Sequence, residues 1–222
     1  MPRPSPLTPD LDRLTRALGG IAPSWRGRME QALPVQATGF AALDALLPGG
    51  GWPIGALTEL LPATDGIGEV SLTLPALRQL CQARRRVILI DPPFMPDPPA
   101  LLSQGLPLQH TLWLETRGGE ERTWAAAQLL REPATGAVLL WSAQRDDRGL
   151  RKLQLAAESG GSLVFLFRGL GECESPSPAA LRLELHPAGG ALEARLRKAR
   201  GGRPGTALIP LPRVAASPVL AS

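Results

Sequence analysis

The stretch LLPATDGIGEVSLTL, residues 60–74, has the form of a phosphate-binding loop that lacks its lysine. A working loop reads G-x-x-x-x-G-K-[ST], because backbone N–H groups wrap the phosphates, the lysine neutralises them and the hydroxyl holds magnesium. Here Gly66 and Gly68 are present, but Ile67 or Glu69 stands at the lysine position, depending on the register. The pattern predicts a turn of the right shape without the groups that bind a nucleotide.

Glu69 argues against a phosphate ligand at this loop. A carboxylate beside a triphosphate repels it strongly where the dielectric is low. A plainer interpretation is that the glycines only turn a strand into a helix that begins near Glu69, whose charge then favours the helix N-terminus. We predict no catalytic residue, metal or cofactor in this degenerate loop, which comprises Gly66, Ile67, Gly68 and Glu69.

The elements that must position this loop are short and well punctuated. Five apolar runs bounded by Gly, Pro or charge are typical of buried strands. They are residues 56–61, 87–91, 111–115, 137–141 and 162–167. Helical repeats separate them, and strand alternating with helix indicates an α/β fold with a mainly parallel sheet flanked by helices.

The C-terminal part of the chain changes pattern. Residues 181–185 and 192–196 alternate apolar and polar side chains, and residues 187–190 between them read Pro-Ala-Gly-Gly. Alternation around such a turn predicts a C-terminal antiparallel β-hairpin at the edge of the sheet.

Three parts are expected along the 222 residues. Residues 1–36 form a Pro-rich arm with one short helix, which docks either on its own core or on a partner. Residues 37–209 form the α/β domain, and residues 210–222, rich in proline, form a disordered tail. No apolar run is long enough to span a bilayer and no secretory signal is visible, so we expect a cytoplasmic protein.

The segment before the loop carries a more specific pattern, ATGFAALDALLPGGGWPIGALTEL. It resembles the T-G-x-x-x-L-D-x-x-L-x-G-G-x-P-x-G signature of RecA-type recombinases. The matching residues are Thr38, Gly39, Leu43, Asp44, Leu47, Gly50, Gly51, Pro53 and Gly55. The resemblance covers about residues 36–205 and implies a RecA-like core.

Three departures from the recombinase pattern agree with one another. The loop lysine is missing. Where recombinases place a catalytic Glu after the second core strand, this chain has Pro92 and Pro93, and where their magnesium Asp stands it has Trp141. Positioning and charge neutralisation of a reacting phosphate are lost together. The resemblance therefore implies a degenerate P-loop ATPase fold that is not an enzyme.

Among RecA-like proteins the sequence is most similar to the ImuA family of translesion-synthesis accessory proteins. The stretches that carry this similarity include GIGE, LRKLQLAAESGG, SPAALRLEL and KARGGRPG. The resemblance implies an accessory role in the SOS response to DNA damage and in mutagenic DNA repair. The implied partners are an ImuB-like Y-family polymerase homologue, RecA and an error-prone DNA polymerase. The alternative is a SulA-like division inhibitor that acts on FtsZ.

Basic residues gather near the C-terminal end, where after residue 190 six of them stand against one acid. Alternation places several on the outward face of the hairpin, where they either contact the phosphates of single-stranded DNA non-specifically or guard an edge strand against aggregation. Glu184 and Glu193 share that face. The candidate DNA-binding residues are Arg182, Arg195, Arg197, Lys198, Arg200 and Arg203.

The tryptophans offer a second route to nucleic acid, by stacking on bases. Trp113, Trp124 and Trp141 lie in predicted elements and are expected to pack in the core. Trp25 and Trp52 lie outside them, and Trp52, beside the glycine-rich entry to the domain, is the candidate contact.

Overall fold

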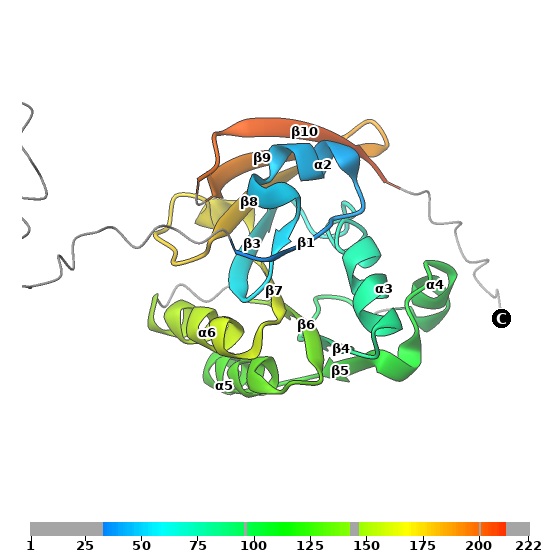
Figure 1. Ribbon diagram of the computed structural model, residues 1–222, viewed down its shortest axis with the longest axis vertical. Helices are drawn as coiled ribbons and strands as arrows, with labels where there is room; N and C mark the ends of the chain where they lie inside the picture. The colour runs from blue at the N-terminus through cyan, green and yellow to red at the C-terminus, as the bar shows by residue number, and fades with distance from the viewer. Residues whose placement is uncertain (1–32, 96, 143–146, 200, 212–222) are drawn as a thin grey trace, which may run out of the picture. The chain divides into compact units, whose positions relative to one another are not determined.

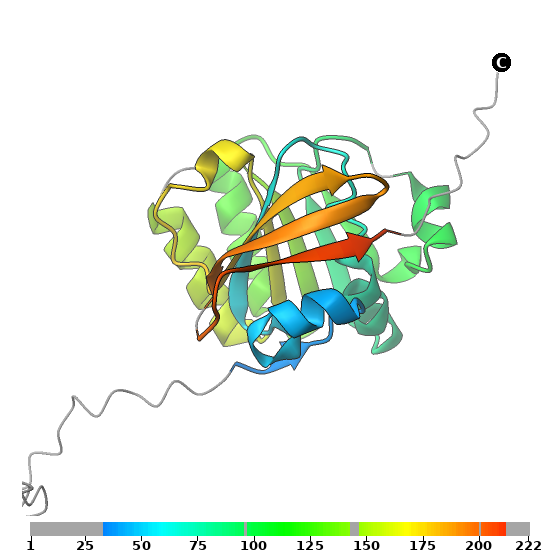
Figure 2. The ribbon, with the colours of Figure 1, turned by 90° about the horizontal axis from the view of Figure 1, so that it is seen from above.

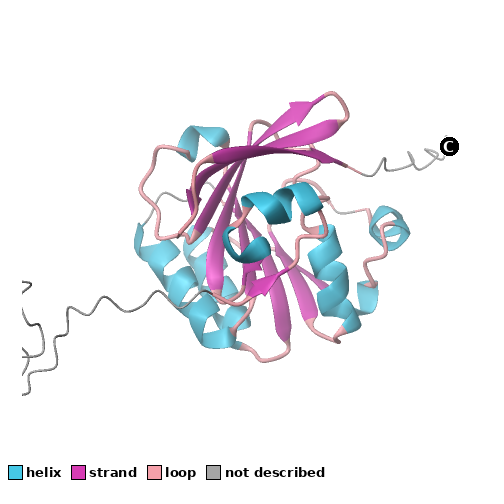
Figure 3. Cartoon of the chain, turned by 45° about the horizontal axis from the view of Figure 1, so that its top comes forward, coloured by secondary structure: helices cyan, strands magenta, loops and turns pink. Residues whose placement is uncertain are grey.

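The computed structural model describes residues 33–95, 97–142, 147–199 and 201–211. These residues form an eight-stranded sheet, a separate two-stranded sheet and helices on both faces of the larger sheet (Figure 1). The order of the large sheet is β10-β9-β8-β3-β7-β6-β4-β5, and Figure 3 shows its strands as one twisted layer.

The five predicted strands are confirmed, and they are parallel to one another. Their side chains are mostly buried on both faces, as near-continuous apolar runs require. The strands are β3 (Ala56–Pro62), β4 (Arg86–Ile90), β5 (Thr111–Leu114), β6 (Thr135–Trp141) and β7 (Leu163–Phe167). Since β3 lies in the middle of the sheet, the loop that follows it opens at the centre of the sheet's carboxyl edge.

Helices cover the parallel strands on both sides (Figures 1 and 2). One core cluster joins α3 to one face of the sheet, and a second joins α5 and α6 to the other. The helices that connect these strands are α3 (Leu74–Gln82), α4 (Pro98–Ser103), α5 (Gly119–Arg131) and α6 (Asp147–Gly160), with the short η2 (Leu108–His110) before β5. Within the described ranges, no helix has the length and apolar character needed to cross a membrane.

The signature segment builds a small cap beside the large sheet. Together with the two residues before it, the segment forms β1 (Val35–Gln36), α2 (Ala41–Leu46), η1 (Pro48–Gly50) and β2 (Trp52–Pro53), and β1 pairs with β2. The Asp44 carboxylate accepts a hydrogen bond from the Thr38 N–H at 2.9 Å, which fixes the entry to α2. A Cβ at Gly51 would lie 2.4 Å from the Gln36 carbonyl oxygen, so this position needs glycine.

The predicted hairpin is present, as β8 (Leu181–Ala188) and β9 (Ala191–Ala199). β8 joins the parallel strands by pairing with β3. A further strand that the sequence did not predict, β10 (Gly205–Pro210), pairs with β9 and forms one edge of the sheet. The expected position of the hairpin at the edge is therefore wrong, because β10 covers β9. The expected tail therefore starts inside a strand, at a position that proline tolerates on an edge. Residues 212–222 and the expected arm helix lie outside the described residues.

Three tryptophans differ from expectation. Trp52 is fully buried and meets Phe165 edge-on at 5.1 Å, so it is a core residue rather than a free contact. Trp124 is exposed because the inward stripe of α5 is made by small residues and Leu130. Trp113 is partly exposed because β5 is the other edge of the sheet. Trp141 is buried as expected, and Trp25 lies outside the described part of the chain.

Candidate functional site

The loop between β3 and α3 continues further than the sequence predicted. Turns extend from Asp65 to Thr73, and α3 begins only at Leu74. The expected helix start near Glu69 is therefore wrong. The later start of α3 follows from Pro75, because proline is favoured in the first turn of a helix and sets the boundary there. Glu69 lies too far before α3 to serve the N-terminus of that helix.

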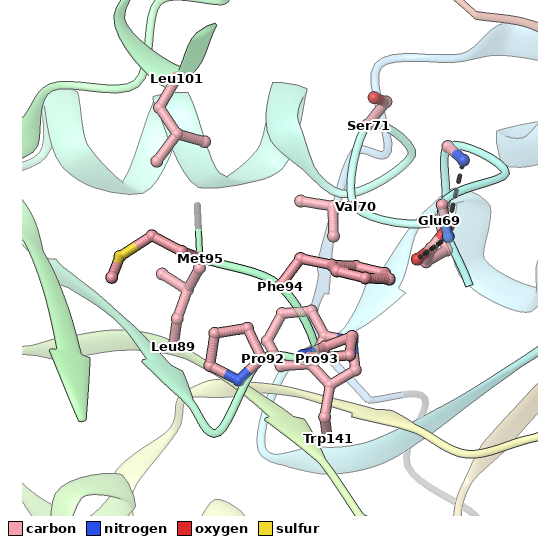
Figure 4. Close-up of a pocket in the computed structure, with 12 residues that line it drawn as sticks. Glu69, Val70, Ser71, Leu89, Pro92, Pro93, Phe94, Met95, Leu101 and Trp141 are labelled. Carbon is pink, nitrogen blue, oxygen red and sulfur yellow. Dashed lines mark hydrogen bonds between the residues drawn. The ribbon is translucent and has the colours of Figure 1, made fainter. Parts of the chain in front are cut away.

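The Glu69 side chain instead turns back into its own loop (Figure 4). Its Oε1 accepts a hydrogen bond from the Gly66 N–H and its Oε2 one from the Gly68 N–H, both at 3.0 Å. The carboxylate is buried, since Glu69 is only 4% exposed. Both glycines have left-handed φ angles, 80° and 104°, that other residues rarely adopt. The backbone donors form an anion-binding concavity, and the chain's own acid fills it.

A carboxylate is a good occupant of such a concavity. Hydrogen bonds from backbone N–H groups to an ionised acceptor are about twice as strong as neutral ones. Among the described residues no arginine or lysine forms an ion pair with Glu69. The negative charge is therefore balanced by the two peptide N–H groups, and a phosphate would have to displace it before meeting them.

A pocket of about 270 Å³ with a mainly apolar wall lies beside the loop, and we call it the apolar pocket. Only Glu69 and Ser71 carry side-chain oxygen in its wall (Figure 4). Its lining is Gly66, Gly68, Glu69, Val70, Ser71, Leu89, Pro92, Pro93, Phe94, Met95, Leu101 and Trp141. These residues come from the loop, from the ends of β4 and β6, from the segment after β4 and from α4.

The apolar pocket brings together the positions at which the sequence departs from an ATPase pattern. Pro92 and Pro93 offer no N–H and no ionisable group. Trp141 ends β6 and stacks on Phe167, with ring centroids 4.5 Å apart. Nothing in this wall can polarise water or hold a metal by the usual oxygen, nitrogen or thiolate ligands beyond the internally bonded Glu69 and a hydroxyl. The arrangement suits contact with apolar groups.

Asp91, directly after β4, was not singled out by the sequence. It has a left-handed φ of 50°, and it accepts hydrogen bonds from the Thr116 N–H at 2.7 Å, from the Thr116 hydroxyl and from Arg122 Nε. Partial burial acts to raise the pKa of Asp91, but the bonds from Thr116 and Arg122 outweigh it and lower the pKa. Asp91 thereby ties the end of β4 to the start of α5.

A second, more polar pocket of about 240 Å³ adjoins the first and shares Pro93 and Trp141 with it. Its charged lining residues are Asp65, Arg122 and Arg168. Arg122 is paired with Asp91, and Arg168 is paired with two glutamates. Among the described residues Asp65 forms no ion pair, and its side chain is exposed.

A buried ion cluster, consisting of Glu59, Arg168, Glu172 and Arg182, lies behind the polar pocket. Glu59 on β3 accepts from Arg168 Nη1 at 3.3 Å, from Arg182 Nε at 2.7 Å and from the Ser177 hydroxyl. Arg168 also pairs with Glu172 at 2.9 Å. Two carboxylates and two guanidinium groups thus meet out of water. The cluster fastens the segment between β7 and β8 to the centre of the sheet.

Arg182 does not lie on an exposed DNA-binding face, which corrects the sequence interpretation. It is 7% exposed, and its guanidinium also donates to the backbone carbonyls of Glu172, Cys173 and Ser175. The register of β8 and β9 shifts directly after Arg182, and parallel pairing sets it beside Glu59. Strict alternation could not reveal a buried acid that lies 123 residues away in the chain.

The other predicted DNA-binding residues that the structure describes differ in their contacts. Arg195 pairs with Glu193, and Arg197 pairs with Glu174 at 2.6 Å and Glu184 at 3.0 Å. The nearby Glu184, with Glu174, raises the pKa of Arg197. The Lys198 ammonium donates to the Ser177 carbonyl, Arg203 is exposed, and Arg200 lies outside the described residues. The structure brings the two β9 arginines to one face, but carboxylates already hold them.

Comparison with known proteins assigns no family to the chain. No protein-family profile matches it, and no curated protein matches it significantly.

Proposed function

We propose that this chain is a non-catalytic accessory protein of damage-induced mutagenesis, with a RecA-like fold whose nucleotide site is defunct. The observation that carries the proposal is the Glu69 carboxylate, bonded to the Gly66 and Gly68 N–H groups at 3.0 Å. These are the donors with which a working loop would hold phosphate. Because Glu69 occupies the Gly66 and Gly68 donors, the loop is poorly suited to ATP, and in this proposal the protein acts by binding partners.

The position of the loop supports a RecA-like origin. β3 leads into it at the middle of a mainly parallel sheet, where α/β proteins bind their ligands. Pro92 after β4 and Trp141 at the end of β6 line the same apolar pocket as the loop. The resemblance places the catalytic Glu and the magnesium Asp of recombinases at these two strand ends. Their convergence fits a nucleotide site that lost its chemistry as a unit.

The proposed partners are an ImuB-like Y-family polymerase homologue, RecA and an error-prone DNA polymerase. Single-stranded DNA is a secondary ligand in this proposal. Arg195 and Arg197 are held by glutamates, so contact with phosphate must compete with existing ion pairs. Such binding is expected to be weak, independent of sequence and sensitive to salt.

The partner proposal is tested by pull-down of the full chain with purified ImuB-like protein and RecA. Fluorescence anisotropy with labelled single-stranded DNA across a salt series tests the DNA contact. We expect at least one protein partner to be retained. Failure of all these interactions would refute the accessory role. Inhibition of FtsZ GTP turnover by the chain would replace it with the division-inhibitor function.

The non-catalytic part is tested separately by ATP turnover in the presence of magnesium and DNA. We expect no turnover above background from the wild-type chain or from Glu69→Ala. Turnover by the wild-type chain that disappears in Glu69→Ala would make Glu69 a functional acid and overturn the proposal.

A further inference from the structure

Two large apolar side chains stand open to solvent at the apolar pocket. Phe94 is 69% exposed and Met95 is 72% exposed, and both line the pocket beside the buried Leu89 and Trp141 (Figure 4). Exposed apolar groups around a hollow of this kind are typical of interaction sites. Methionine in addition adapts its shape to different apolar partners. The feature calls for an occupant that covers both side chains.

The size of the apolar pocket limits that occupant. At about 270 Å³ it exceeds a cavity of roughly 150 Å³ that accepts benzene, but it falls short of the roughly 300 Å³ at which sites for whole small ligands begin. It is also open on the side of Phe94 and Met95. This volume fits one or two side chains that project from a longer segment.

The charges nearby exclude an anionic occupant and favour a basic one. Glu69 occupies the anion-binding concavity formed by the Gly66 and Gly68 N–H groups. Asp65 lines the adjoining polar pocket without an ion pair among the described residues. Asp97 lies one helical turn before Leu101, whose N–H bonds to the Asp97 carbonyl, and its side chain is exposed. The arginines of the polar pocket are already neutralised by acids.

We infer that the apolar pocket is the docking site for a segment of a partner protein that carries a bulky apolar side chain with a lysine or arginine close to it in sequence. The apolar side chain enters between Phe94, Met95 and Trp141. The basic side chain meets Asp65 in the adjoining polar pocket. This inference rests on the proposed accessory function, because it gives the protein–protein contact a place on the surface.

The experiment selects peptides from a random phage-displayed library on the full-length chain, with counter-selection on the double variant Phe94→Ala/Met95→Ala. Both side chains are exposed, so this variant is expected to keep its thermal unfolding midpoint. We expect enrichment of sequences in which Phe, Trp, Leu or Met is followed or preceded closely by Lys or Arg. A labelled peptide of the enriched class then serves as the probe in anisotropy titrations.

The double variant should bind the labelled peptide at least about tenfold more weakly than the wild type, as loss of a central apolar contact does. Leu208→Ala is the matched control, since Leu208 is 58% exposed on β10 and lines neither pocket. It should leave affinity unchanged. Asp65→Asn should weaken binding about threefold at low salt and less at high salt, whereas Glu115→Gln, also exposed, should not.

The inference is overturned if acidic or purely polar peptides are selected, if the double variant binds the probe as the wild type does, or if inorganic phosphate or ATP competes for the pocket. Self-association lost in the double variant would also overturn it, since the occupant would then be a second copy. If the double variant still binds the ImuB-like protein or RecA, docking at the apolar pocket is refuted but the accessory function is not. If the chain binds the selected peptides but none of the proposed mutagenesis partners, the accessory function is refuted but docking at the apolar pocket is not.

Discussion

Two acids on either side of one strand end show how differently this fold uses a buried carboxylate. Glu59, inside β3, is fully buried and forms ion pairs with Arg168 and Arg182. Glu69, in the loop after β3, is buried almost as deeply but is held by backbone N–H groups alone. The first joins distant parts of the chain, and the second joins a loop to itself.

The difference separates stability from function. Burying a charge is tolerated when partners repay its loss of hydration, and Glu59 has them in two guanidinium groups that come from β8 and from the end of β7. Glu69 has only donors that a ligand would otherwise use. Loss of Glu59 should therefore loosen the domain, whereas loss of Glu69 should mainly change what the loop can bind.

The largest effect is expected from Glu59→Gln. The substitution keeps the volume but leaves Arg168 and Arg182 buried without their shared counter-ion, which should lower the free energy of unfolding by about 3–5 kcal/mol. Urea denaturation followed by circular dichroism measures this. Glu193→Gln, which removes a surface partner of Arg195, is the control and should cost less than about 0.5 kcal/mol. Equal effects of the two variants would erase the contrast.

A smaller loss of stability is expected from Glu69→Gln. The amide oxygen can still accept from one glycine, but its NH₂ group cannot accept from the other, so one buried N–H loses its partner at a cost of about 1–3 kcal/mol. The same denaturation measurement applies. In Glu69→Ala both N–H groups become available, and sulfate should stabilise this variant more than the wild type. Absence of any sulfate difference would show that Glu69 does not mask the site.

Asp91 is a third case in this comparison. Its carboxylate is partly buried and accepts hydrogen bonds from a backbone N–H, a hydroxyl and a guanidinium group. Its pKa is lower in the folded chain than in the unfolded chain, so its stabilising contribution is present at neutral pH and is lost as the pH falls through the lowered folded pKa. Asn tolerates the left-handed backbone, so Asp91→Asn should cost about 1–2 kcal/mol at pH 7. The difference from wild type should shrink as the pH falls through the lowered pKa of Asp91. A constant difference would contradict the charge-based account.

The smallest effect on stability is expected from Arg197→Ala. The Arg197 side chain is 44% exposed, so solvent and salt weaken its pair with the exposed Glu174 and also its pair with the more buried Glu184. The urea midpoint should stay close to that of the wild type, while any affinity for single-stranded DNA should fall and its salt dependence should flatten. A large drop in stability with unchanged DNA affinity would show that Arg197 belongs with the structural arginines.

The parallel core was predictable because short apolar runs between helical repeats have few other ways to be buried. The alternating hairpin was predictable for a similar reason, from its period of two and its Pro-Ala-Gly-Gly turn. β10 was missed because its residues contain no polar alternation strong enough to stand out beside the prolines that follow. Pro210 is accepted there only because the strand is an edge.

At the candidate site, the absence of a loop lysine was readable from the sequence, but the contacts of the loop were not. Gly66, Gly68 and Glu69 signalled a degenerate loop, yet no local pattern says that the acid folds back onto the glycine N–H groups. Arg182 was misplaced for a related reason, because its partner Glu59 is far away in sequence and adjacent only through the β3–β8 pairing. Long-range pairing decides such positions, and a single sequence does not encode it in any local period.

The central position of β3 also has a consequence for how this protein is made. β3 ends at Pro62, but its two neighbours, β7 and β8, begin only at Leu163 and Leu181. During synthesis a sheet-forming stretch whose one charged residue is Glu59 must therefore wait unpaired until most of the chain has left the ribosome. Folding through such distant partners is slow and exposes aggregation-prone surface. Production should accordingly benefit from lower temperature and from chaperones that shield nascent chains.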